Sequence, residues 1–468
     1  MRIEKIISFV FYFILAYFKT YAQQKSDLHI LSIEEFINIV RLYHPIVKQA
    51  DINIQMAKAN LLSARGGFDP SFYVNNEQKT FDGKNYYNYT NPELKIPTWY
   101  GIEVKAGLEN NSGQFLNSEA TSGQTSYVGL SVPLAKNLFI DKRRATLQQS
   151  KIFINLSNAD RLNTINDIMF DAYAAYYNWV KEFQLYNNIT EAVKVNEARF
   201  GLVKIGYRQG DRPAIDTVEA LAQLQNFQYL QSESLVKYKN AALEISNFLW
   251  IENNTPYILS DEAPQIITSL DDKPVPIIDE LLYTASVNHP KLKMFDYKLA
   301  SLVVERKLKF QSLLPTVNLK TNLLNKGYSV LKNASIPFYE NNYKFGLDVG
   351  MPLFFREGRG AYRAAKLKIQ QNEYELSMQQ LEVSNKIKYY YNEVVGLKQQ
   401  IQISENIYKN NQLLFSGEDT RFKGGESTLF LLNSRENKVL ETFQKLIELR
   451  FKLNKSLVAL QWAAGQLR

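Results

Sequence analysis

One pattern of helix breaks and strand entries occurs twice in this chain of 468 residues. His44-Pro45 returns as His289-Pro290, and Pro70 returns as Pro315, in both cases 245 residues later. Proline interrupts a helical pattern, and proline ahead of an alternating run marks the entry to a strand. Matching breaks at one spacing indicate two copies of a single structural unit. The rest of the sequence has to be compatible with this duplication.

A second set of matches continues in the same order and defines where the copies end. Strand exits at Val132-Pro133 and Met351-Pro352 are followed by long proline-free segments, which end at Gly210 and Gly425. Each copy therefore reads as a helix, strands, a very long helix and a final helix. The expected parts are a first repeat, an irregular proline-containing linker and a second repeat, over residues 23–252, 253–276 and 277–468.

The first 22 residues have the composition of a cleavable secretory signal. Arg2 and Lys5 precede an apolar run from Ile6 to Phe18 that only Ser8 interrupts, and small residues lead up to Ala22. The run has about 13 residues, short of the roughly 20 that a membrane-spanning helix needs. We therefore predict a signal peptide over 1–22 and export of the remaining chain.

Composition excludes several classes of protein. Cysteine is absent, so the sequence predicts no disulfide framework, no thiolate chemistry and no N-terminal lipid anchor. The net charge of +8 comes from interspersed groups, which is unlike the clustered basic surface that binds nucleic acid. The 29 tyrosines are many for a largely helical chain, and tyrosine suits the boundary between lipid and water.

Alternating apolar and polar residues predict membrane-crossing strands in both copies. The runs are separated by turns rich in Asn, Gly and Ser, as in barrel strands. In the first copy the alternating positions include Tyr100, Ile102, Val104, Ala106 and Leu108, and then Val128, Leu130 and Val132. In the second copy they are Val317, Leu319, Thr321 and Leu323, and then Tyr343, Phe345, Leu347, Val349 and Met351.

The long proline-free segments predict helices that supercoil on their neighbours. From Asp141 to Ile205 the only glycine is Gly201, and at 1.5 Å per residue such a helix spans roughly 100 Å. Its apolar positions recur at spacings of three and four: Leu162, Ile165, Met169, Ala172, Tyr176, Trp179, Phe183 and Tyr186. The second copy repeats this with Val383, Ile387, Tyr390, Val394, Leu397 and Ile401. A sustained 3.5-residue repeat indicates helices packed along other helices.

Two crossings per copy give four strands for the chain, which are too few to close a barrel. Open strand edges in lipid leave unpaired backbone groups at several kcal/mol each. The simplest closed solution is a homotrimer with twelve pooled strands, continued into the periplasm by a helical barrel. The predicted fold class is α+β, with two tandem helix–strand–long helix–helix repeats and four strands per protomer in a trimeric 12-stranded outer-membrane β-barrel.

Seven motifs in this order, present in both copies, resemble the TolC family of outer-membrane efflux channels over essentially the whole mature length. They include Ile33-Glu34-Glu35-Phe36, the two His-Pro breaks, the strand-entry prolines and Gly129-Leu130-Ser131-Val132-Pro133-Leu134. They continue with Asp141-Lys142-Arg143-Arg144, Glu357-Gly358-Arg359-Gly360, the segment from Tyr207 to Asp216 and the segment from Arg421 to Glu426.

The resemblance implies the passive outer-membrane channel of a tripartite efflux or type I secretion system. The expected partners are two further copies of the chain, outer-membrane lipid, a periplasmic adaptor protein and an inner-membrane pump of the ABC, RND or MFS type. The strands would lie in the outer membrane and the helices would extend into the periplasm. No cofactor, metal or nucleic acid is implied.

The first copy departs from this pattern in the strand region. It has 63 residues between Pro70 and Pro133, against 37 between Pro315 and Pro352. An even number of crossings is required, because the chain leaves and re-enters the periplasm. The excess is interpreted either as an extended extracellular hairpin or as strands protruding above the membrane, and the crossings within 71–133 stay open.

The family resemblance places the gate and the adaptor contact at the two turns between long helices. The candidate site residues are Gly210, Asp211, Asp216, Gly424, Gly425 and Glu426. Glycine allows the positive φ that a tight reversal requires. Carboxylates multiplied by symmetry around a narrow mouth would favour cations.

Two other classes of function are alternatives to the channel. A periplasmic coiled-coil adaptor of the membrane-fusion type would share the long helices, but it would lack strand patterns in both copies. An enzyme would need a catalytic constellation. His29, His44 and His289 are far apart in sequence, and no serine lies in a G-x-S-x-G turn. Gly358-Arg359-Gly360 stands between a strand and a helix without a βαβ unit, so it is interpreted as a structural turn.

Overall fold

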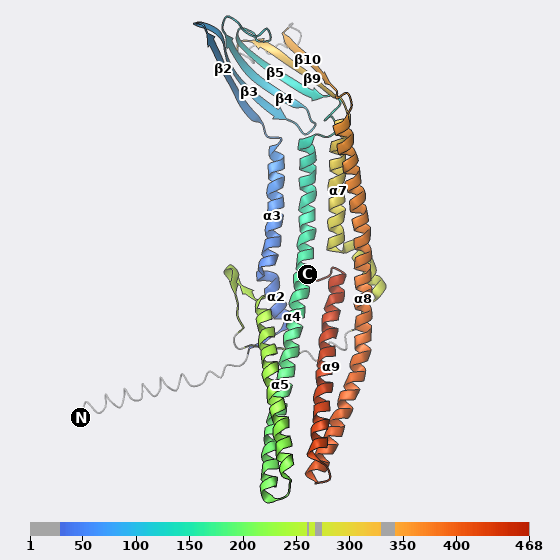
Figure 1. The fold of residues 1–468 in the computed structure, drawn as a ribbon. Helices are drawn as coiled ribbons and strands as arrows, with labels where there is room; N and C mark the ends of the chain where they lie inside the picture. The colour runs from blue at the N-terminus through green and yellow to red at the C-terminus, as the bar shows by residue number, and fades with distance from the viewer. Residues whose placement is uncertain (1–28, 260–261, 267–273, 329–341, 468) are drawn as a thin grey trace, which may run out of the picture. The chain divides into compact units, whose positions relative to one another are not determined.

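The computed structural model describes residues 29–259, 262–266, 274–328 and 342–467. The predicted signal peptide and residues 267–273 of the predicted linker therefore lie outside the described residues. The chain forms two compact units (Figure 1). Unit 1 combines residues 1–47, 165–280 and 386–468, and unit 2 combines 48–164 and 281–385. Each unit thus draws on both halves of the chain.

Long helices make up most of both units. The first half contains α2 (Ile33–Tyr43), α3 (Pro45–Gly66), α4 (Lys142–Gln209) and α5 (Ala214–Ser246). The second half contains α6 (Ile278–Asn288), α7 (Pro290–Phe310), α8 (Arg356–Lys423) and α9 (Leu429–Ala463). Both α4 and α8 have 68 residues. The helices follow the same order in the two halves, while the duplication and its boundaries stay a prediction.

Unit 2 contains a six-stranded antiparallel sheet in the order β10-β9-β5-β4-β3-β2. Its strands are β2 (Ser71–Phe81), β3 (Lys84–Pro97), β4 (Glu103–Ser112), β5 (Gly123–Pro133), β9 (Thr316–Lys326) and β10 (Tyr343–Gly350). Because β5 pairs with β9, strands from both halves of the chain share one sheet. Figure 1 shows the sheet at one end of the long helices of this unit.

The sheet contains six strands rather than the expected four per protomer. The excess residues of the first half form two further strands of the same sheet, because β3 pairs with β2 on one side and with β4 on the other. The sequence pattern obscured β3, in which Tyr86 and Tyr87 are adjacent and Pro92 interrupts the run. Tyr100 and Ile102, expected in a strand, lie in the turn that precedes β4.

Side chains of the sheet alternate between an apolar face and a polar face. On the apolar face, Phe345, Leu347 and Val349 of β10 are 62%, 52% and 67% exposed. On the polar face, Tyr127 donates a hydrogen bond to Glu93 at 2.6 Å, and Lys320 pairs with Asp348. Gly107 leaves the space that the Tyr127 ring occupies, since a Cβ there would lie 2.5 Å from the ring. The exposed apolar face requires an apolar environment.

Unit 1 is built on an aromatic and aliphatic core between helices. Trp179 and Tyr176 of α4 are fully buried against Phe36 of α2 and Ile245 of α5. The Tyr176 hydroxyl donates to the carbonyl of Leu31 at 2.7 Å. The smaller elements of this unit are β1 (His29–Leu31) paired in parallel with β8 (Glu262–Pro264), β6 (Trp250–Ile251) paired with β7 (Thr255–Pro256), and the short helix Glu252–Asn254.

The predicted helix seams are buried where they pass through unit 1. Ile165, Met169, Ala172, Tyr176 and Trp179 are at most 5% exposed. The second-copy positions Ile387, Val394, Leu397 and Ile401 are at most 6% exposed. The seam prediction is therefore confirmed at these positions. Burial on α4 is wider than one seam, because Ile168, Ala175, Tyr177 and Val180 are also buried.

Within the described part of the chain, every helix is too polar or too short to span a lipid bilayer.

Candidate functional site

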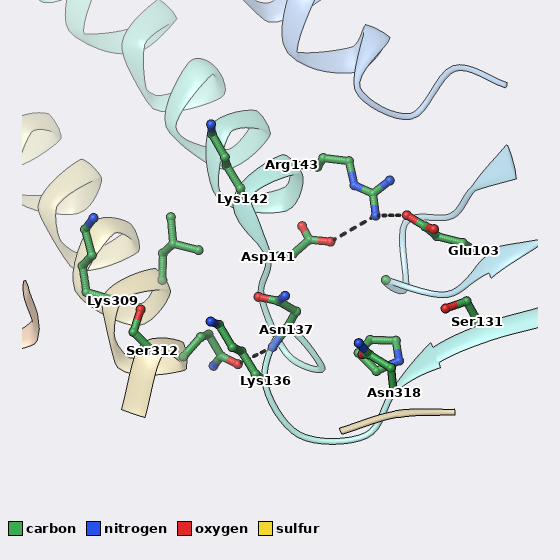
Figure 2. Close-up of a pocket in the computed structure, with 14 residues that line it drawn as sticks. Glu103, Ser131, Lys136, Asn137, Asp141, Lys142, Arg143, Lys309, Ser312 and Asn318 are labelled. Carbon is green, nitrogen blue, oxygen red and sulfur yellow. Dashed lines mark hydrogen bonds and ion pairs between the residues drawn. The ribbon is translucent and has the colours of Figure 1, made fainter. Parts of the chain in front are cut away.

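The strands and helices of unit 2 meet at a polar junction, shown in Figure 2. Asp141 precedes α4, and its carboxylate accepts a hydrogen bond from the backbone N–H of Arg144 at 2.8 Å. An acid at this position satisfies a free amide of the first turn and interacts favourably with the helix dipole. Arg143 donates to Glu103 at 2.9 Å, and Lys95 lies 3.1 Å from the same carboxylate. These contacts fix the β3–β4 turn to the start of α4.

A pocket of about 390 Å³ opens at this junction. Its lining combines basic, acidic and neutral polar side chains, among them Lys136, Lys142, Glu103, Asp141, Ser312 and Asn318 (Figure 2). The backbone N–H of Asn137 donates to the Gln311 side chain at 3.0 Å, which ties the segment after β5 to the end of α7. The junction therefore holds the ends of the strands against the ends of the helices. Its charged groups stabilise the turns by which the chain passes from strand to helix.

The turn between α4 and α5 contains three of the predicted site residues. Gly210 has φ +83°, and its amide donates to the carbonyl of Tyr207 at 3.1 Å. The amide of Asp211 donates to the carbonyl of Gly206 at 2.9 Å. This pair of hydrogen bonds is a Schellman motif, in which glycine is favoured because a Cβ strains a positive φ. Asp216 lies in the first turn of α5.

The turn between α8 and α9 has the same backbone geometry. Gly425 has φ +76°, and its amide donates to the carbonyl of Phe422 at 3.2 Å. The amide of Glu426 donates to the carbonyl of Arg421 at 2.8 Å. Gly424, the third predicted residue of this turn, is exposed. Each long helix is thus ended by glycine in the left-handed region, at equivalent places.

A small apolar core and one arginine join the two turns within unit 1. Residues of α4, α5, α8 and α9 are buried together here: Val203, Ala220, Phe422, Leu429 and Leu432. The guanidinium of Arg212 lies 4.2 Å from the centroid of the Phe422 ring. Its Nη1 atom lies 3.4 Å from a carboxylate oxygen of Asp216. Arg212 therefore contacts both turns, although sequence reasoning did not single it out.

The predicted acidic residues have different surroundings. The Asp216 side chain is 19% exposed and is paired with Arg212. Asp211 and Glu426 are exposed, as are the basic residues Arg208 and Lys423 of the same turns. The two turns therefore present charges of both signs, and Asp216 has a role in holding its turn together.

A buried ion pair lies between the long helices of unit 1. Arg199 of α4 donates from Nη1 and Nη2 to the Glu436 carboxylate of α9 at 2.6 and 3.1 Å. Asn196 donates to the same carboxylate at 3.2 Å. The side chains of Arg199 and Glu436 are 10% and 11% exposed. In the sequence, Asn196 and Arg199 are polar residues three positions apart on an apolar stripe of the helix. A helix face in water shows the same pattern, so the sequence does not identify the ion pair.

His44 and His289 each cap the helix that follows them. The Nδ1 atom of His44 accepts from the backbone N–H of Ile46 at 3.2 Å, and Nδ1 of His289 accepts from the N–H of Lys291 at 3.2 Å. Burial lowers the pKa of His44. The two histidines thus have equivalent capping roles at the two predicted helix breaks.

Comparison with known proteins gives a family for the second half of the chain. Residues 281–466 match the family model described as outer membrane efflux protein. No curated protein matches the sequence.

The second half of this chain is similar to the outer membrane efflux protein family.

Solved structures of outer-membrane channels have the same fold over nearly the whole chain. The CmeC outer membrane channel of Campylobacter jejuni is 14% identical with a TM-score of 0.66, covering 93% of this chain and 85% of its own. CusC is 11% identical with a TM-score of 0.67, covering 95% and 94%. The open state of the MtrE channel of Neisseria gonorrhoeae is 14% identical with a TM-score of 0.64, covering 93% and 89%. These structures share the combination of long helices and a sheet that the resemblance in the motifs implies.

Proposed function

We propose that this protein lies in the outer membrane and forms, as a homotrimer, the exit duct of a tripartite efflux or type I secretion system. It would passively conduct substrate from a periplasmic adaptor and an inner-membrane pump of the ABC, RND or MFS type to the outside. The protein itself would carry out no catalysis. Among the described residues, no group of three or more His, Asp or Glu side chains is arranged to hold a metal.

The amphipathic sheet is the observation that carries this proposal. An exposed apolar face on antiparallel strands, backed by a polar face with hydrogen-bonded and ion-paired side chains, suits strands with lipid on one side and water on the other. The sheet leads directly into helices whose buried seams pack along one another in unit 1. A periplasmic coiled-coil adaptor, the alternative reading, gives no reason for such a sheet.

The two turns that end the long helices are the proposed contact with the adaptor. Large apolar side chains around them are exposed, although the neighbouring core is well packed: Leu202, Ile205, Ile215, Val218, Phe430 and Leu431. Exposed apolar surface of this kind marks protein contacts. The rigid Schellman turns at Gly210 and Gly425 would hold this surface in a defined geometry for docking.

Surface labelling tests the orientation of the protein. A cysteine placed at Ser118, in the β4–β5 loop, is expected to react with a membrane-impermeant maleimide on whole cells. A cysteine at Arg208, beside the α4–α5 turn, should react only after the outer membrane is opened. The chain has no cysteine of its own, so each signal is unambiguous. Labelling of the Arg208 position on intact cells would contradict the proposed orientation.

Removing Arg212 tests whether the turns form a gate. Arg212→Ala deletes both the contact with Phe422 and the pairing with Asp216. Such contacts contribute about 1–2 kcal/mol together at partly exposed sites. This free energy corresponds to roughly a 5–30-fold rise in the population of an opened tip. We expect higher open probability and conductance in planar bilayers, with normal assembly.

Arg208→Ala is the matched control for this experiment, because Arg208 is an exposed arginine on the same turn. It should leave the conductance unchanged. Asp216→Ala should shift the conductance in the same direction as Arg212→Ala. Equal conductance of all three variants and the unchanged protein would show that the turns are structural reversals without a gating role.

A further inference from the structure

All six strands of the sheet start or finish where the helices attach. β2 follows α3, β5 leads into α4, β9 follows α7, and β10 leads into α8. The β3–β4 turn returns to the same end, where Trp99 stacks on Phe68 with ring centroids 4.1 Å apart. Glu103, at the start of β4, accepts a hydrogen bond from Arg143 of α4. The two additional strands therefore run from the helix end of the sheet, as the other four do.

The far ends of the strands meet a common loop. Tyr86 of β3 lies 4.8 Å from Phe115 in the β4–β5 loop, measured between ring centroids. Lys344 of β10 pairs with Glu119 of the same loop at 2.9 Å. β2, β3 and β4 have 11, 14 and 10 residues, and β5 and β9 have 11 each. Five of the six strands therefore have at least the roughly 9 residues with which tilted strands cross a membrane, and β10 has 8.

One row of apolar side chains crosses all six strands in register. From β2 to β10 its members are Phe72, Leu94, Ala106, Val128, Leu323 and Tyr343. The next row lies on the opposite face and contains no apolar side chain: Ser71, Lys95, Lys105, Gly129, Asn322 and Lys344. Strands β2 and β3 thus share the alternation of the other four strands at the end nearest the helices, where Phe72 and Val74 of β2 and Leu94 and Ile96 of β3 lie on the apolar face. Further along β2 this face carries Asn76, Gln78 and Thr80.

The two edges of the sheet are complementary in direction. Every neighbouring pair is antiparallel, so β10 and β2 also run in opposite directions. Neither edge strand contains proline, which would remove a donor from the edge. An open edge in lipid costs several kcal/mol for each unpaired backbone group. The β10 edge of one copy therefore fits the β2 edge of another.

We propose that each protomer contributes all six strands, so that β10 of one copy pairs with β2 of the next and the trimer closes an 18-stranded barrel. This inference rests on the proposed homotrimeric channel. It replaces the expected twelve-stranded closure, in which β2 and β3 have no place. Barrel diameter grows about linearly with strand number, so the barrel would be about one and a half times as wide as a twelve-stranded one.

A barrel of this size has a wide aqueous lumen lined by the polar face. Barrels of 16–18 strands leave an open water channel. The charged residues of this face would line that channel: Glu93, Lys95, Lys105, Lys320 and Asp348. Bulky hydrated cargo, such as a polypeptide, would therefore not be limited by the outer-membrane section.

Disulfide cross-linking in the cysteine-free chain tests the closure. The four test pairs each join one β2 position to one β10 position on the apolar face: Phe72→Cys or Val74→Cys with Phe345→Cys or Leu347→Cys. The oxidation control is Val128→Cys with Leu323→Cys, which are direct partners within one protomer. The rival pair is Ala106→Cys with Phe345→Cys, which would join β4 to β10 in a twelve-stranded barrel.

Oxidised outer membranes are analysed on denaturing gels without reductant. We expect at least one β2–β10 pair to give a ladder of covalent dimer and trimer, while the β4–β10 pair stays monomeric. A ladder from the β4–β10 pair overturns the 18-stranded closure. So does a native trimer without a ladder from any β2–β10 pair when the control disulfide forms. A native mass of one protomer would instead overturn the homotrimeric channel itself.

An arginine scan of β2 gives an independent measurement. Val74 lies on the apolar face and Asn75 on the polar face of the same edge strand. In the 18-stranded barrel, Val74→Arg puts a charge into lipid, and the yield of outer-membrane trimer should fall at least tenfold. Asn75→Arg should assemble normally. Equal yields for the two variants would overturn the placement of β2 in the membrane.

Discussion

Replacing Glu436 with glutamine is expected to destabilise the protein by about 3 kcal/mol, because it leaves the charge of Arg199 buried without its partner. This value is at the lower end of the range for broken buried pairs, since each side chain is about a tenth exposed. The loss should appear as a lower midpoint of urea unfolding in detergent, followed by tryptophan fluorescence. Replacing both partners with apolar residues, Arg199→Met with Glu436→Leu, should restore most of the stability.

The exposed pair of Lys194 and Glu191 provides the control for this experiment. Its side chains are 63% and 68% exposed, and Glu191→Gln should change the stability by no more than about 0.5 kcal/mol. Each glutamine substitution removes a carboxylate that pairs with a basic side chain of α4. The difference between their effects on stability therefore measures the contribution of burial. A Glu436→Gln variant as stable as the Glu191→Gln variant would show that water reaches Arg199 in the assembled protein.

Replacing Trp179 with aspartate should prevent assembly altogether. Trp179 is fully buried beside Tyr176, with ring centroids 5.9 Å apart. Truncation of a buried tryptophan costs about 3–5 kcal/mol, and an unpaired buried charge adds several more. The sum is comparable with the entire stability of a typical domain. We expect degraded protein and no heat-resistant trimer in outer membranes.

Tyr176→Phe is the conservative variant at the same site. It keeps the ring and removes only the hydroxyl that donates to Leu31 at 2.7 Å, so it should cost about 1 kcal/mol and still assemble. Normal trimer and export for Trp179→Asp would mean that this surface of α4 faces water, contrary to its burial in the structure.

The helices were predictable because their signals are local and long. The absence of proline and the recurrence of apolar residues over many turns specify α4 and α8 without any knowledge of what packs on them. The glycines that end both helices were predictable for the same reason, since a left-handed residue is required wherever a helix reverses tightly. The contact of Arg212 with Phe422 was not, because its two members are far apart in sequence.

The sheet shows the limit of local patterns. β3 contains Pro92 and adjacent tyrosines, so its own sequence does not read as a strand. Its identity comes from its neighbours, because β2 and β4 supply backbone hydrogen bonds on both sides and a common register. The strand count therefore followed from pairing, and pairing is a property of the folded chain.

The sequence by itself determined the helices, their buried seams, the turns that end them and the resemblance to outer-membrane efflux channels. Each of these depends on residue periodicity or on a backbone conformation that one or two residues impose. Only the tertiary structure decided that six strands share one sheet, that Arg199 and Glu436 are partners, and that Arg212 joins the two turns. Strand pairing and buried ion pairs depend on which distant segments meet, and a one-dimensional pattern does not encode those distances.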